Sequence, residues 1–258
     1  MNSGLSKQET TVGSFSCADD FSGSIQFGNY AIYLLGSYTV DTFTVSTGSL
    51  SIPKTATSIS IAGDVITSSG EQYYGCPVIL NKFIRLTAST ATFDNTISCG
   101  TDAGAEGLEI TGNAVFNGDV TSTGDISVSG TTKIACSSIT TPGTTGNNGK
   151  QIYSGAVTIT SSTTFSSIST ITFGSTIDGK TANAQNLTIS AHNGTTKKAI
   201  TFTGAVGSTV PLGKVTVNYG EATANGAFSA QSLEITSNAK FTPAASSIVT
   251  LAGDFTNN

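Results

Sequence analysis

The chain has 258 residues, including 29 glycines and 5 prolines, and it contains no tryptophan. Only 10% of its residues are charged, and 11 basic and 16 acidic residues give a net charge of −5. A nucleic-acid-binding protein is disfavoured, because neutralising phosphates needs a clustered basic face and the only adjacent lysines are Lys197 and Lys198. No window combines helical apolar spacing with caps at both ends, so we expect almost no helix.

The segment 1–69 differs from the rest of the chain. Seven of the 20 aromatic residues (13 Phe and 7 Tyr) fall between Phe15 and Phe43. We expect this segment to be a cap, or the first turns, of a repeat structure; an aromatic platform for sugars is the competing interpretation. Residues 1–4 are polar, and the apolar run 30–35 is too short to cross a bilayer and has no basic flank, so no signal peptide is expected. The repeat-like sequence at the C-terminus predicts a piece of a longer protein, or a subunit that meets a neighbour there.

Short strands are predicted along the remaining sequence wherever apolar residues alternate with small polar ones. The predicted strands are 42–45, 58–61, 78–80, 108–111, 114–116, 126–128, 157–160, 170–173, 187–190, 199–203 and 214–219. Glycines between them are expected to form turns through positive φ, namely Gly48, Gly63, Gly118, Gly124, Gly130, Gly179, Gly207 and Gly226.

An internal repeat organises this region. The segment 70–80 returns at 149–159, with Gln72 and Tyr74 matched by Gln151 and Tyr153 at a constant offset. We therefore expect repeat units at about 70–148 and 149–232 and a partial unit at 233–258, stacked so that matching side chains lie above one another. The predicted core residues are Val157, Ile159, Ile171, Phe173, Leu187, Ile189 and Phe202, with Val78, Leu80, Phe93, Leu108 and Ile110 in the earlier copy.

The predicted fold is all-β, an elongated parallel β-solenoid of stacked irregular repeats. Recurrence of similar strands at irregular spacing favours the solenoid, since insertions at its corners leave the stacking intact. Tandem β-sandwich domains are the alternative. The pattern leaves the handedness of the coil open.

A family resemblance supports the solenoid. Residues 151–159 (Gln-Ile-Tyr-Ser-Gly-Ala-Val-Thr-Ile), 171–179 (Ile-Thr-Phe-Gly-Ser-Thr-Ile-Asp-Gly), 185–189 (Gln-Asn-Leu-Thr-Ile) and 202–207 (Phe-Thr-Gly-Ala-Val-Gly) resemble repeats of filamentous-haemagglutinin-like and autotransporter-type bacterial surface proteins. The likeness covers about residues 70–258. It implies an extracellular β-solenoid at the cell surface, acting as an adhesin, spacer or fibre without a catalytic centre or cofactor.

The four cysteines depart from that resemblance, because such passengers are usually poor in cysteine. Cys17, Cys76, Cys99 and Cys136 lack the Cys-x-x-Cys spacing of zinc or redox sites, so no metal site is expected. If the chain is exported, Cys99 with Cys136 and Cys17 with Cys76 are candidate bridges, although four cysteines allow three pairings. The alternative is that each cysteine is a small buried hydrophobe.

Catalysis is not expected. The chain has one arginine, Arg85, and one histidine, His192, and no Gly-x-Ser-x-Gly elbow accompanies the histidine. His192 is interpreted as a surface turn residue. Four aspartates follow glycine or Asn-Gly at strand entries, namely Asp64, Asp119, Asp125 and Asp254. We interpret them first as turn-forming residues and only second as acids for catalysis.

The function predicted from these features is a non-enzymatic, extracellular structural or adhesive β-solenoid, part of a bacterial surface adhesin or fibre. A filament subunit joined head to tail and a β-helix carbohydrate-active enzyme are the alternatives. The expected partners are a glycan or protein on a host or neighbouring cell, or other copies of the chain end to end. Ice binding through Thr-x-Thr motifs, as at 170–172 and 201–203, is disfavoured because their spacing along the chain is uneven.

Overall fold

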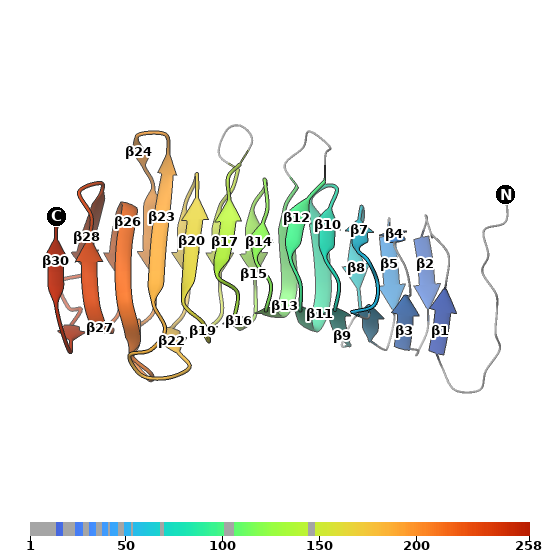
Figure 1. Ribbon diagram of the computed structural model, residues 1–258, viewed down its shortest axis with the longest axis horizontal. Helices are drawn as coiled ribbons and strands as arrows, with labels where there is room; N and C mark the ends of the chain where they lie inside the picture. The colour runs from blue at the N-terminus through green and yellow to red at the C-terminus, as the bar shows by residue number, and fades with distance from the viewer. Residues whose placement is uncertain are drawn as a thin grey trace.

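The computed structural model is an all-β rod in which the polypeptide coils around one long axis (Figure 1). It describes residues 49–258 except 53, 68–69, 101–105 and 144–147, and before residue 49 it describes only the backbone of five short strands. The described residues contain no helix, and hence none long and apolar enough to cross a membrane. Apart from one hairpin, every described strand pair is parallel. This parallel pairing confirms the predicted solenoid and excludes tandem sandwiches, whose sheets are antiparallel.

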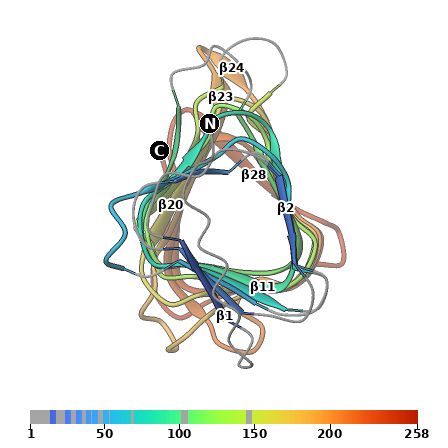
Figure 2. The same ribbon diagram turned by 90° about the vertical axis from the view of Figure 1, so that its right-hand side faces the viewer.

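The coil has three faces, each a ladder of strands stacked along the axis (Figure 2). Face 1 consists of β1 (Ser14–Cys17), β3 (Ala31–Leu34), β6 (Leu50–Ile52), β9 (Glu71–Tyr74), the second halves of β11 (Ile84–Phe93) and β13 (Leu108–Phe116), β16 (Thr132–Ile134), β19 (Val157–Ile159), β22 (Ile177–Gly179), the first half of β27 (Phe228–Ile235) and β29 (Val249–Leu251).

Face 2 consists of β4 (Tyr38–Val40), β7 (Ile59–Ile61), β10 (Val78–Leu80), β12 (Ile97–Cys99), β14 (Val120–Thr121), β17 (Ser138–Thr141), β20 (Thr163–Ser167), β23 (Leu187–Asn193), the first half of β26 (Leu212–Ala224), the second half of β27 and β30 (Phe255–Asn257). Face 3 consists of β2 (Ser24–Phe27), β5 (Thr42–Val45), β8 (Val65–Ile66), the first halves of β11 and β13, β15 (Ile126–Val128), β18 (Gln151–Tyr153), β21 (Ile171–Phe173), β25 (Ala199–Phe202), the second half of β26 and β28 (Ala239–Pro243).

The coil is right-handed. Figure 2 views the rod from its N-terminal end, with β2 of face 3 on the right, β1 of face 1 at the bottom and β20 of face 2 on the left. The chain visits the faces in the order 3, 1, 2 as it recedes, so it turns clockwise away from the viewer. This is the hand that parallel strand crossovers adopt almost without exception.

The corners between faces absorb the irregular spacing of the sequence. Leu108 pairs with Ile126, whereas Ile171 pairs with Ile200, which lies considerably further along the chain from its partner. Both pairings keep the strands in register, because the extra residues leave the coil at a corner. One such excursion is the antiparallel hairpin of β23 and β24 (Thr196–Lys197), which projects from the rod in both ribbon views (Figures 1 and 2).

A single apolar core fills the coil. All twelve predicted core residues are buried, none of them more than 1% exposed, which confirms the alternation. Aromatic rings stack in this core on successive turns, Tyr74 on Phe93 at 4.9 Å and Phe93 on Phe116 at 5.5 Å between ring centroids. A second stack joins Tyr153, Phe173 and Phe202 at 5.4 and 5.3 Å.

The expectation that matched repeat positions lie above one another is wrong. Tyr74 lies on face 1 and its sequence match Tyr153 on face 3, because the chain between them passes two further faces after its last full turn. The offset between the matched segments is therefore not a whole number of turns of the coil, so the two copies fall on different faces.

The expected positive φ at the turn glycines is also wrong for most of them. Of those whose structure is described, only Gly207 has a positive φ, +63°. Gly118, Gly130 and Gly226 show a different requirement. A Cβ on these glycines would lie 2.2, 2.6 and 2.7 Å, respectively, from backbone atoms of the preceding turn. These glycines let successive corners stack at close range.

The interpretation of residues 15–43 as an aromatic cap or sugar platform depends on side chains outside the described residues. The backbone of β1 to β5 in this segment pairs in parallel like the later strands.

Candidate functional site

The matched segments of the repeat build two buried polar clusters. Gln72 Nε2 donates to the carbonyl oxygens of Val65 at 3.0 Å and Thr87 at 3.1 Å, and the Tyr74 hydroxyl donates to Gln72 Oε1 at 2.9 Å. Each of the five polar atoms in this cluster therefore has a hydrogen-bond partner at one corner of the coil. Such pairing is needed because an unpaired polar group is costly in the low dielectric of a core.

The second cluster reproduces the first at a different corner. Gln151 Nε2 donates to the carbonyl oxygens of Ile139 at 3.2 Å and Ser166 at 2.8 Å, and the Tyr153 hydroxyl donates to Gln151 Oε1 at 3.3 Å. Burial raises the pKa of both tyrosine hydroxyls, so each stays a donor at neutral pH. The matched segments 70–80 and 149–159 therefore encode buried hydrogen-bonded clusters that join strands inside the coil.

Aspartate side chains at the corners form hydrogen bonds from one turn of the coil to the next. Asp119 accepts from the backbone N–H groups of Ser137 and Ser138, and Asp125 accepts from those of Gly149 and Lys150, all at 2.8–2.9 Å. Asp64 accepts from the Arg85 N–H at 3.0 Å in the same way. These three aspartates lie at corners as predicted, but their carboxylates accept from N–H groups of the next turn of the coil and not from those of their own corner. They thereby satisfy N–H groups that would otherwise stay unpaired.

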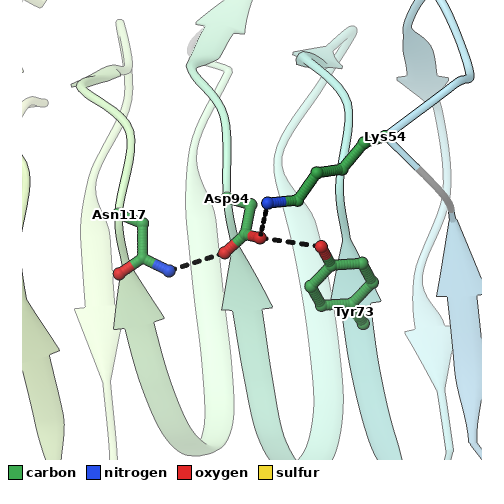
Figure 3. A network of polar contacts seen from close by, with 4 residues as sticks. All are labelled: Lys54, Tyr73, Asp94 and Asn117. Atoms are coloured by element: carbon green, nitrogen blue, oxygen red, sulfur yellow. Dashed lines mark hydrogen bonds and ion pairs between the residues drawn. The ribbon is translucent and has the colours of Figure 1, made fainter.

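A surface polar network joins four successive turns beside face 1 (Figure 3). Asp94 Oδ2 accepts from the Tyr73 hydroxyl at 2.7 Å and pairs with Lys54 Nζ at 2.9 Å, and Asp94 Oδ1 accepts from Asn117 Nδ2 at 2.6 Å. The Tyr73 hydrogen bond, followed by the Lys54 ammonium, lowers the pKa of the Asp94 carboxyl. Lys54 is largely exposed, so the hydrogen bonds stabilise this network more than the ion pair does. The network binds turns together, and sequence reasoning did not anticipate it.

His192 lies at the base of the projecting hairpin. Its ring packs on Tyr219 with centroids 4.2 Å apart, and its Nδ1 donates to the Gly194 carbonyl oxygen at 2.9 Å. In a Ser-His-Asp triad Nδ1 would bind an orienting carboxylate, whereas here it holds the hairpin turn. The Tyr219 hydroxyl also donates to the Thr195 carbonyl oxygen, at 3.1 Å. Tyr219 stands at an irregularity in the pairing of β23 with β26, and such bulges re-aim side chains.

Arg85 is engaged with neighbours on face 3. Its Nε donates to Glu109 Oε2 at 3.0 Å, and its guanidinium lies over the Phe83 ring at 5.3 Å from the centroid. Arg85 and His192 belong to strands separated by several turns, β11 and β23, so the structure does not bring them into one site.

The candidate bridge between Cys99 and Cys136 is not formed. Cys76, Cys99 and Cys136 are free thiols, and the side chain of Cys17 lies outside the described residues. Cys99 ends a face 2 strand, whereas Cys136 precedes the start of one, which places them at opposite edges of that face. Burial raises the pKa of the Cys136 thiol to about 12, as expected of an unreactive core cysteine.

Among the described residues no cluster of three or more His, Cys, Asp or Glu side chains is placed to hold a metal ion. Glu106 is nevertheless buried, with 1% exposed. Its Oε2 accepts from the Thr123 hydroxyl, while Oε1 has no hydrogen-bond partner within the described part of the chain. Glu106 adjoins residues 101–105, which lie outside that part.

Threonines of two Thr-x-Thr motifs align despite their uneven spacing. Thr172, Thr201, Thr223 and Thr242 are register partners on four successive strands of face 3. Uneven spacing in the sequence is therefore no argument against a regular surface array, because strand pairing sets the spacing at about 4.8 Å. The neighbouring column on the same strands contains Glu221 and Lys240, so the array is one threonine wide and flanked by charge.

These features define the chain as a right-handed parallel β-solenoid whose polar side chains mainly join its turns. Comparison with protein families, with curated proteins and with solved structures finds no match to the chain.

Proposed function

We propose that this chain is a non-enzymatic structural β-solenoid of a bacterial cell surface, the shaft of an adhesin or fibre. The observation that carries the proposal is the use of its reactive side chains: Asp64, Asp119 and Asp125 accept backbone hydrogen bonds between turns, Asp94 joins four turns, and His192 braces a hairpin. A scaffold that uses its carboxylates in this way favours stiffness over chemistry.

The extracellular location is supported by the resemblance of residues 70–258 to surface-protein repeats and by the Ser- and Thr-rich, weakly charged composition. The free thiols of Cys76, Cys99 and Cys136 give the location no support, since oxidising compartments favour disulfides.

We assign adhesive contact to the hairpin 192–198, which projects from the rod (Figure 1). Its tip residues 193–197 are exposed, and neither Lys197 nor Lys198 has an ion-pair partner among the described residues. Because the hairpin is braced by Tyr219, little conformational entropy is lost on binding. An acidic glycan on a neighbouring or host cell suits these two ammonium groups.

Protease shaving of intact producing cells tests the location. We expect antibodies against the chain to lose their signal after proteinase treatment of whole cells, while a cytoplasmic marker survives. A signal protected until lysis would refute the surface assignment. For adhesion, the double variant Lys197→Ser/Lys198→Ser is expected to reduce binding of the purified chain to an acidic glycan array. Lys180→Ser, which removes an exposed lysine from another corner, is the matched control.

A further inference from the structure

Face 2 carries two parallel columns of Ser and Thr side chains on its outward side. The first column runs over β17, β20, β23 and β26 and consists of the register partners Ser138, Thr164, Thr188 and Thr216. The second column runs over β14, β17, β20 and β23 and consists of Thr121, Thr140, Ser166 and Ser190. The residues between the columns, Ile139, Phe165 and Ile189, are buried in the core. We call the eight residues of the two columns the hydroxyl array.

The hydroxyl array is regular in two directions, because strand geometry sets both of its spacings. Neighbours within a column lie about 4.8 Å apart, the distance between paired strands, and the columns lie about 6.6 Å apart, two residues along a strand. The strands β14, β17, β20 and β23 follow one another along the rod (Figure 1). Uneven corner lengths leave this pattern intact, so the objection to ice binding from uneven motif spacing does not apply to it.

The hydroxyl array contains no charge across its centre. The strands β14, β17, β20 and β23 contain no Asp, Glu, Lys or Arg. The first column meets a charged residue, Glu234, only in the strand after Thr216. The matching outward position on face 1 differs, because Thr158 lies there between Lys133 and Asp178. An uncharged surface of this kind suits a neutral ligand.

The hydroxyl groups at the centre of the array are available to such a ligand. Within the part of the chain that the structure describes, no hydrogen bond occupies the side-chain hydroxyls of Thr140, Thr164, Ser166 and Thr188. At the edge of the array, by contrast, the Thr216 hydroxyl donates to Glu234 Oε2 at 3.4 Å. A hydroxyl both donates and accepts hydrogen bonds, as a water molecule does. Threonine is β-branched and stiff, so its hydroxyl loses little freedom on binding.

Ice is a neutral lattice of donor–acceptor groups with spacings close to those of the array. Water molecules hydrogen-bonded at about 2.75 Å in tetrahedral geometry place second neighbours about 4.5 Å apart, and the same geometry repeats about every 7.3 Å along the hexagonal axis. Each distance lies within about a tenth of the corresponding spacing in the array. Liquid water has no fixed lattice, so the regularity of the array favours the crystal over the liquid.

We propose that the hydroxyl array is an ice-binding surface, in which the hydroxyls of Thr140, Thr164 and Thr188 take the places of water molecules at the crystal face. The inference rests on the proposed structural function, because a stiff rod is needed to hold the columns in register. It deepens that function by giving the rod a crystalline target besides the acidic glycan assigned to the hairpin.

Slow growth of ice on a cold finger, in a dilute solution of the purified chain, tests the inference. The measured quantity is the concentration of the chain in the ice divided by that in the remaining liquid, relative to a co-dissolved globular protein. We expect the unaltered chain to be enriched in the ice. Thr164→Lys should lower its ratio about tenfold, because it replaces a central hydroxyl with a bulky charge. Thr158→Lys, at an exposed threonine of the neighbouring strand β19 on face 1, is the matched control and should partition like the unaltered chain.

Thr188→Lys supplies a second disruption on the adjacent strand of the array. Circular dichroism and urea midpoints check that each variant keeps its fold. Exclusion of the unaltered chain from ice to the same extent as the globular protein would overturn the inference. So would variants Thr164→Lys and Thr188→Lys that both partition like the unaltered chain, or an equal loss in Thr158→Lys. Protease shaving does not involve ice, so the two proposals fail separately.

Discussion

Replacing Phe173 with alanine probes the stacked core most directly. Phe173 is fully buried, stacked between Tyr153 and Phe202 at centroid distances of 5.4 and 5.3 Å, with the edge of Phe165 at 5.2 Å. A buried Phe→Ala change costs about 3–5 kcal/mol, and each aromatic pair adds roughly 0.5–1.5 kcal/mol beyond area burial. Three lost pairs place the cost of Phe173→Ala near the upper end of that range, at about 5 kcal/mol.

The assay is urea unfolding followed by far-UV circular dichroism, with hydrogen exchange on peptides from residues 151–206 to locate the effect. Exchange is needed because long repeat arrays need not unfold as one unit. Phe241→Ala is the matched control: this partly buried ring makes one pair, with Phe228 at 5.1 Å, and its loss should cost about 1–2 kcal/mol. An unchanged midpoint for Phe173→Ala, or an equal shift for Phe241→Ala, would refute the stacking argument.

Three further predictions concern the polar contacts and the close packing between turns. Asp94→Ala should lower the free energy of unfolding at pH 7 by roughly 1–3 kcal/mol. Because the folded state lowers the pKa of this carboxyl from 3.8, the difference from the unaltered chain should persist above that value and vanish as the pH falls through the folded pKa, as urea midpoints measured across pH will show. Gln151→Leu should cost roughly 1–3 kcal/mol by stranding the Tyr153 hydroxyl, and Gln151→Leu/Tyr153→Phe should recover part of that; a double variant less stable than the single would contradict the cluster. Gly112→Ala should cost at least about 2 kcal/mol in thermal unfolding, since its φ is +129° and a Cβ would lie 1.8 Å from a backbone oxygen, whereas Gly194→Ala, in open space, should cost less.

Alternation in the sequence was sufficient to assign many side chains to the inside or outside of the coil. Val157, Ile159 and Phe173 are buried as predicted, and Thr158 and Thr172 between and beside them face outward. This property is local, because successive residues of any strand point to opposite sides whatever the strand pairs with. Asp64, Asp119 and Asp125 lie at corners as the glycines before them indicated, but the sequence did not show that their carboxylates bind N–H groups of the next turn.

Which strands share a face was decided only by the tertiary structure. Corners between strands differ in length, so the sequence distance from Ile171 to its partner Ile200 gives no hint that they pair, and the matched residues Tyr74 and Tyr153 lie on different faces. The network of Asp94 with Lys54 and Tyr73 was unpredictable for the same reason, since it joins residues distant in the sequence whose contact depends on stacking. Local backbone chemistry determines where each strand and each corner forms. The lengths of the corners determine which strand stacks on which, and this becomes evident only in the three-dimensional structure.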